Sequence, residues 1–244
     1  MQGSTHVVEH IDPRTARSRE LLRDALAAEI DLTRDLSRVT VTAVSDRAGL
    51  TRRTFYSHFR DIPDLVSQVE NETVEALRPY VAQIAAVHLD ELSRAIRHLE
   101  PCPGSVELLE FLGERGSYLG PLLGDGGDPA FAKRLEALVR EVVSARALEG
   151  LDSEAVGAFF DYYLTYAISA EVGVLVRWLT TGRRESARTM ARVMTALMFV
   201  RPGDLYGKSI DFDVHGIGLA LARRSIRPPW AKHDRSERAR PQPE

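Results

Sequence analysis

Apolar residues recur at three- and four-residue spacing along most of this chain, which is the period of an α-helix with one buried face. No stretch alternates between apolar and polar residues for long enough to predict a β-strand, and no internal repeat is present. Clusters of glycine and proline, such as those at 101–104 and 124–129, separate the helical stretches. The sequence therefore predicts an all-α fold, with helices over residues 13–33, 41–48, 52–59, 61–79 (or, kinked at Pro79, 61–86), 89–99, 103–115, 128–149, 152–181 and 185–199.

Residues 40–65 contain the most specific pattern in the chain, two short helices joined by a glycine turn and followed by a long helix. Thr40 and Thr51 are placed to cap the two short helices, because a threonine hydroxyl accepts an unpaired backbone N–H of the first helical turn. Gly49 follows the first of them, where a left-handed residue often ends a helix. Phe55 and Phe59 form an apolar pair in the second helix, whose other positions carry arginine, tyrosine, histidine and hydroxyl side chains. This arrangement is typical of a DNA-reading helix-turn-helix.

The same stretch resembles the DNA-binding domain of the tetracycline-repressor (TetR) family of bacterial transcriptional regulators. The resemblance implies an N-terminal three-helix helix-turn-helix domain over residues 13–60 and a C-terminal helical domain for ligand binding and dimerisation over residues 61–200. Ile62 and Pro63 depart from the family pattern, because they stand where a lysine and an acidic residue are usual. The matching residues are Thr40-Val41 at the helix start, the Ala48-Gly49-Leu50 turn, the Thr54-Phe55-Tyr56 run, the His58-Phe59 pair and Leu65 in the long helix.

Charge is divided unevenly along the chain. Residues 1–60 carry ten arginines and eight acidic residues, a net charge of +2, whereas residues 61–222 carry fifteen basic and twenty-four acidic residues, a net charge of −9. The positive charge of the N-terminal segment, which contains the motif, suits a surface that faces phosphates. DNA would repel the acidic middle segment of the chain. Residues 1–12 are predicted to be disordered, and residues 201–244 to form a C-terminal extension that ends in an Arg/Pro-rich tail.

Composition excludes several other classes of protein. With 44% hydrophobic and 27% charged residues, the chain is ordinary for a globular protein. It has no run that approaches the ~20 apolar residues of a membrane span. Its first residues contain no apolar signal core. We therefore expect a cytoplasmic protein, associated with the nucleoid when bound to DNA and with no membrane partner. Cys102 is the single cysteine, which excludes an intramolecular disulfide and a cysteine-based zinc site.

The predicted DNA contacts lie in the two motif helices and at their starts. Arg52 and Arg53 begin the second helix, where guanidinium groups can reach guanine O6 and N7 or phosphate oxygens. The resemblance implies that Tyr56 and His58 bind phosphates, which sets the register of the protein on DNA rather than reading its sequence. The full set, in which the threonines are candidates for a base edge, a thymine methyl group or a phosphate, is Thr40, Thr42, Arg52, Arg53, Thr54, Tyr56 and His58.

The resemblance supplies two further sets of candidates in the C-terminal domain. A ligand pocket is expected between the middle helices, and its aromatic candidates, for which a plain core is the alternative, are Tyr80, Phe111, Tyr118, Phe159, Tyr162 and Tyr166. The helix over 152–181 is apolar over more than one face, as expected of a helix buried on several sides. The resemblance implies that it and the helix over 185–199 pair with those of a second copy. The predicted interface residues, for which an intramolecular core is the alternative, are Tyr163, Val174, Trp178, Met190, Met194 and Leu197.

No pattern of an enzyme is present. The sequence has no glycine-rich phosphate loop and no GxSxG motif, and its seven histidines show no metal-ligand spacing. We therefore expect no catalytic residue, metal or cofactor. The sequence predicts a homodimeric repressor that binds a palindromic operator in double-stranded DNA and responds to an unknown small-molecule effector. Three alternatives remain open: a transcriptional activator, a DNA binder that acts without a ligand, and an all-α protein-interaction module without specific DNA binding.

Overall fold

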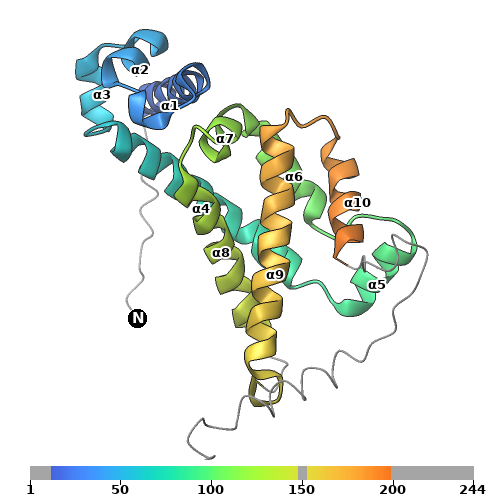
Figure 1. The fold of residues 1–244 in the computed structure, drawn as a ribbon. Coiled ribbons are helices and arrows are strands. Elements are labelled where there is room, and N and C mark those ends of the chain that lie inside the picture. The colour runs from blue at the N-terminus through green and yellow to red at the C-terminus, as the bar shows by residue number, and fades with distance from the viewer. Residues whose placement is uncertain (1–11, 148–152, 199–244) are drawn as a thin grey trace, which may run out of the picture.

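The computed structural model describes residues 12–147 and 153–198 of the 244-residue chain. Helices joined by turns make up this part, which contains no β-strand, so the all-α prediction is confirmed. Figure 1 shows α1–α3 as a small unit at one end of the molecule, from which α4 runs into a larger bundle. The elements are α1 (Pro13–Thr33), the 3-10 helix η1 (Leu36–Arg38), α2 (Val41–Ala48), α3 (Arg52–His58), α4 (Ile62–Ala85), α5 (Leu89–Arg97), α6 (Ser105–Glu114), α7 (Gly116–Leu123), α8 (Pro129–Ala147), α9 (Ser153–Thr180) and α10 (Ala187–Leu197).

The caps of the two short helices form where the sequence predicts them. The Thr40 hydroxyl accepts the Ala43 backbone N–H at 3.2 Å at the start of α2. The Thr51 hydroxyl accepts the Thr54 backbone N–H at 3.1 Å at the start of α3. Gly49 ends α2 with a φ of +67°, a left-handed conformation that glycine adopts without strain. Local hydrogen bonds therefore define the helix-turn-helix before long-range packing is considered.

A shared apolar core joins α1, α2, α3 and the first turns of α4. Phe55 and Phe59 are both buried in it, with ring centroids 5.8 Å apart. Because α4 contributes to this core, the helix that leads into the bundle is also part of the N-terminal unit. The other large buried side chains of this core are Leu22, Leu26, Ile30, Val44, Leu65 and Val66.

Two features of the bundle were left open or missed by the sequence prediction. α4 continues through Pro79 to Ala85, which decides between its two predicted ends. α7 was not predicted as a helix, because its glycines and its internal Pro121 are poor helix formers. The helix forms nevertheless, since burial of its apolar side chains outweighs their weak propensity. The buried residues of α7 are Gly116, Tyr118, Leu119 and Leu122.

The N-terminal unit is attached to the bundle through α7 and the loop that follows it. α1 packs more extensively on α7 than on any other described element. The Arg23 guanidinium of α1 lies over the buried Tyr118 ring, 4.4 Å from its centroid. Beyond the end of α1, the Leu36 backbone N–H donates to the Gly126 carbonyl oxygen at 2.8 Å. A side chain at Gly126 has no room there, because its Cβ would lie 2.7 Å from the Arg34 carbonyl carbon.

We predict that Gly126→Ala lowers the free energy of unfolding by about 1–3 kcal/mol, because the added methyl group pushes the loop away from α1. Denaturant unfolding followed by circular dichroism measures this change. Asp125→Ala alters an exposed neighbour in the same loop and should stay within about 0.5 kcal/mol of the wild type. A Gly126→Ala protein as stable as the wild type would show that the loop does not need this close approach.

Candidate DNA-binding surface and regulatory sites

α3 presents a polar outer face because its apolar side chains point inward. Phe55 is completely buried, whereas Arg52 and Arg53 are exposed. Tyr56 is 58% exposed, and its ring meets that of Phe55 edge-on with centroids 5.6 Å apart. The Phe55 contact orients the Tyr56 ring while its outer side stays accessible. The three exposed residues offer cationic and hydroxyl groups side by side, which suits contacts with phosphate and base edges.

α2 is held on α1 by a partly buried ion pair. Arg47 donates from Nε to the Glu29 carboxylate at 2.6 Å, and the Glu29 side chain is almost completely buried. Val44 is also buried, so α2 directs the exposed Thr42 away from the core. Thr40, at the cap of α2, is exposed as well. The ion pair and the Val44 contact therefore fix the orientation of both threonines.

Thr54 and His58 are half-buried, unlike the other five predicted DNA-contacting residues. The Thr54 hydroxyl lies 2.9 Å from that of Thr51, so the two residues form a small hydroxyl cluster at the start of α3. Burial, and then the charge of Arg19, holds the pKa of His58 below its usual value. His58 is therefore a neutral imidazole near pH 7, able to donate one hydrogen bond to an anion.

Sequence reasoning missed Arg60, at the corner between α3 and α4. Its side chain is 86% exposed, although Nη2 approaches the Asp64 carboxylate at 3.3 Å. Its backbone N–H donates to Asp64 at 2.8 Å, and this bond is the main reason that the pKa of Asp64 lies below its usual value. Arg60 adds a cation beside Ile62 and Pro63, which replace the usual lysine of the family pattern. The sequence did contain a signal for this residue, because Arg60 directly follows the His58-Phe59 pair.

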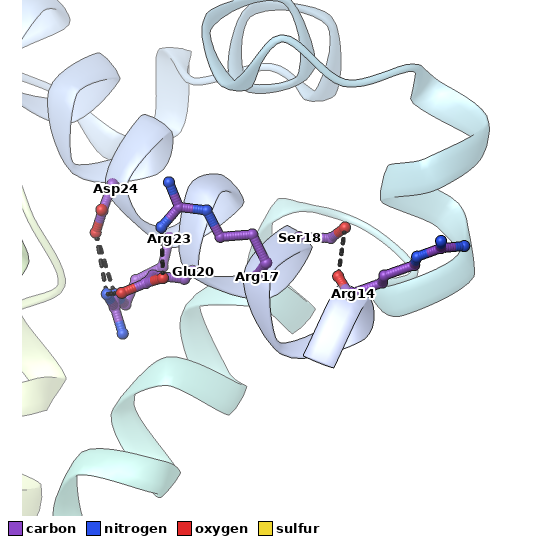
Figure 2. Close-up of polar contacts among 6 residues, drawn as sticks. All are labelled: Arg14, Arg17, Ser18, Glu20, Arg23 and Asp24. Atoms are coloured by element: carbon purple, nitrogen blue, oxygen red, sulfur yellow. Dashed lines mark hydrogen bonds and ion pairs between the residues drawn. The ribbon is translucent and has the colours of Figure 1, made fainter. Parts of the chain in front are cut away.

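The arginines at the start of α1 are largely paired with neighbouring carboxylates, as Figure 2 shows. Arg17 pairs with Glu20 at 3.0 Å, and Arg23 approaches Asp24 at 3.2 Å. Arg14 extends away from this cluster (Figure 2). α1 carries four arginines and four acidic residues and so has no net charge, which leaves the outer faces of α2 and α3 as the stronger candidate for contact with DNA.

A comparison with protein families bears on the other end of the chain. A family model described as a transcriptional regulator C-terminal region (TetR_C_8) matches residues 100–199. Residues 100–199 are therefore similar to the C-terminal region of TetR-family transcriptional regulators. This match covers α6–α10, whereas the helix-turn-helix resemblance lies in residues 40–65, so two separate parts of the chain point to the same family. A search of the curated proteins found no match. Among the described residues, no helix combines the length and the apolar character that crossing a membrane requires.

The aromatic residues predicted to line a ligand pocket lie in different surroundings. Tyr80 and Phe111 are in contact, with ring centroids 4.8 Å apart. Tyr118 instead lies at the junction with α1, and Tyr162 and Tyr166 are each 74% exposed on α9. The part of these three residues in a ligand pocket stays a prediction. The side chain of the sixth candidate, Phe159, lies outside the described residues.

The Tyr80–Phe111 contact connects α4 with α6 and includes a cation. The Arg115 guanidinium lies 3.6 Å from the centroid of the Phe111 ring and donates to the Phe111 carbonyl oxygen at 3.0 Å. Tyr80 and Phe111 are half-buried. A half-buried aromatic pair with a guanidinium on top is an arrangement that can stack a planar ligand.

The predicted dimer residues fall into buried and accessible groups. Trp178 and Met190 are buried within the protomer, and Trp178 donates from Nε1 to the Glu185 carbonyl oxygen at 3.1 Å. Their own chain covers both side chains, which leaves little of either available to a second copy. Val174 and Met194 are half-buried, whereas Tyr163 and Leu197 are 52% and 45% exposed.

We predict that Thr51→Ala lowers the free energy of unfolding by about 1 kcal/mol, because the Thr54 N–H loses its capping partner at the start of α3. Thr51→Ser keeps a hydroxyl at the same position and should be close to the wild type. Urea unfolding of the three proteins measures the difference. Equal losses for the alanine and serine variants would contradict the capping role.

Proposed function

We propose that this chain is a repressor that binds a palindromic DNA operator as a homodimer and leaves it when a small molecule binds. The observation that carries the proposal is the division of α3 between a buried inner face, with Phe55, and an exposed outer face, with Arg52, Arg53 and Tyr56. A short helix that is anchored by its inner face and exposes arginines outward can enter the major groove of DNA.

Each residue of this surface has a role in the proposal. Arg52 and Arg53 contact guanine O6 and N7 or phosphate oxygens, because a guanidinium suits both. Tyr56 and His58 donate to phosphates, and Arg60 adds a further phosphate contact at the α3–α4 corner. Thr40, Thr42 and Thr54 are assigned to base edges, thymine methyl groups or phosphates near the two helix starts.

The proposed dimer forms through the outer faces of α9 and α10, the last two described helices of the bundle (Figure 1). Large apolar side chains are exposed on both helices, and exposed apolar side chains of this kind offer a surface for association. Tyrosine is also enriched in protein–protein interfaces. The exposed residues are Tyr162, Tyr163 and Tyr166 on α9 and Val193, Leu197 and Met198 on α10.

We assign the effector site to Tyr80 and Phe111, where α4 meets α6. This site lies on the same helix that carries Leu65 and Val66 in the N-terminal core. A ligand that favours one position of α4 would shift the population between DNA-binding and non-binding geometries. The unknown ligand is expected to be planar, because the half-buried pair offers aromatic faces.

We predict that Arg53→Ala weakens binding to the operator by about 1–3 kcal/mol, because a bidentate contact with guanine would be lost. Fluorescence anisotropy with the DNA that flanks the gene of this protein, measured across a salt series, gives the affinity. Arg94→Ala, which removes an exposed arginine from α5, is the matched control and should bind like the wild type.

A scrambled duplex completes that experiment. The proposal expects wild-type binding to one flanking fragment to exceed binding to the scrambled duplex by about a thousandfold or more. Equal, steeply salt-dependent binding to both duplexes would indicate contacts with phosphates alone. An Arg53→Ala protein with unchanged affinity for both would remove Arg53 from the recognition surface.

We predict that Tyr166→Glu converts the dimer to monomers, because it places a charge on the exposed face of α9. Sedimentation velocity over a range of protein concentrations measures the assembly state. Leu32→Glu changes an exposed leucine on α1, remote from this face, and should remain dimeric. A Tyr166→Glu protein that is still dimeric would exclude this face of α9 from the interface.

A further inference from the structure

A groove with a volume of about 630 Å³ lies between α1 and α4. Its lining includes the apolar side chains of Ala16, Phe59 and Val69, and the last two are almost completely buried at its floor. The volume is in the range of pockets that hold small organic molecules. None of the residues assigned above to DNA or to the effector lines this groove.

Three arginines of α1 also line the groove, and a carboxylate lies beside each of them. Arg17 pairs with Glu20 at 3.0 Å, and Glu20 lies between Arg17 and Arg23, 3.9 Å from the latter (Figure 2). Arg19 pairs with Glu72 of α4. With three arginines and two glutamates, the lining has a net charge of +1, which favours an anionic ligand.

Aromatic rings hold two of these arginines in place. The Arg19 guanidinium lies over the Phe59 ring, 4.8 Å from its centroid, and donates from both Nη atoms to Gln68 at 3.1 Å. The Arg23 guanidinium lies over the Tyr118 ring at 4.4 Å. Because Arg19 and Arg23 are four residues apart on α1, their side chains are neighbours on the helix surface. Two oriented guanidinium groups lower the entropic cost of binding an anion between them.

The carboxylates beside these arginines can give way to a carboxylate of a ligand. The side chains of Glu20 and Glu72 are 48% and 64% exposed, so either of them can turn toward water. Ion pairs between exposed side chains contribute little to stability, because both partners are well hydrated when apart. A ligand carboxylate binds a guanidinium with the same geometry as a glutamate does.

We propose that the groove between α1 and α4 is a second small-molecule site, which binds an organic acid with a short apolar tail. The carboxylate of the acid lies between Arg19 and Arg23, in the place of the glutamate side chains. Its tail lies along Ala16 and covers the floor of the groove. This site is separate from the effector site at Tyr80 and Phe111, and binding to it does not require DNA.

Isothermal titration calorimetry of the full chain with octanoate, octanamide and acetate tests this site. Octanoate has both the charge and the apolar tail, whereas octanamide lacks the charge and acetate lacks the tail. We expect octanoate to bind once per protomer and the other two compounds to bind at least about tenfold more weakly. Octanamide or acetate that binds as tightly as octanoate would overturn the proposed ligand class. Octanoate that shows no saturable binding would overturn the site.

Four variants locate the binding of octanoate. Arg19→Ala should weaken it by about tenfold or more, because an oriented guanidinium is lost. Ala16→Glu adds a carboxylate at an exposed position of the groove and should abolish binding while the protein stays folded. Glu72→Gln should strengthen binding, because Arg19 then has no competing carboxylate on α4. Arg78→Ala is the matched control and should bind octanoate like the wild type, since Arg78 also pairs with carboxylates but lies outside the groove.

Phe111→Ala distinguishes the groove from the effector site proposed above. Octanoate binding that is lost in Ala16→Glu and unchanged in Phe111→Ala supports the groove, whether or not the protein is a repressor. Binding that survives Arg19→Ala and Ala16→Glu but is lost in Phe111→Ala would place the acid at the effector site and overturn the proposal. A Glu72→Gln protein that binds octanoate no more tightly than the wild type would also contradict it.

Discussion

The packing of α1 on two partners at once is the constraint on which the arrangement of this molecule depends. One side of the helix carries Leu22, Leu26 and Ile30 into the core with α2 and α3, and another rests on α7. A single continuous set of buried side chains results, so the N-terminal unit and the bundle are not separated by a free linker. Burial at about 25 cal/mol per Å2 makes such a shared face hard to open. A change of angle between the two parts must therefore move α1 and α7 together or slide one on the other.

Buried carboxylates occur at both of the joints that fix the N-terminal unit, and they differ in their partners. Glu29 pairs with Arg47 at 2.6 Å and locks α2 to α1 with opposite charges. Glu70 lies 3.1 Å from Arg134 of α8, and neither of its carboxyl oxygens has a well-aligned hydrogen bond within the described part of the chain. The first joint determines how the candidate DNA-binding helices are presented, and the second lies where the bundle meets the same unit.

The helix caps and the glycine turn were predictable from the sequence, whereas contacts between elements distant in the sequence were not. The Thr40 and Thr51 caps and the left-handed Gly49 depend on residues within a few positions of one another, so residue types alone specify them. α7 was missed because its stability comes from contacts with α1 and α9, which no local pattern records. The burial of Trp178 within its own chain was not predictable, because an apolar side chain looks the same in the sequence whether its own chain or a second copy covers it. Arg60 was overlooked because exposure at a helix corner depends on the turn that follows.

α4 connects the N-terminal core with the contact between Tyr80 and Phe111. It runs unbroken from Ile62 to Ala85, with Pro79 inside it, over a length of about 36 Å at 1.5 Å per residue. Leu65 at one end belongs to the core beneath α3, and Tyr80 near the other end meets Phe111. Glu70 lies between them, one and a half turns beyond Leu65. A ligand that separates Tyr80 from Phe111 would thus act on the helix that enters the N-terminal core. Because α4 cannot move independently of the core that contains Leu65, such a movement would reach the residues that orient α3.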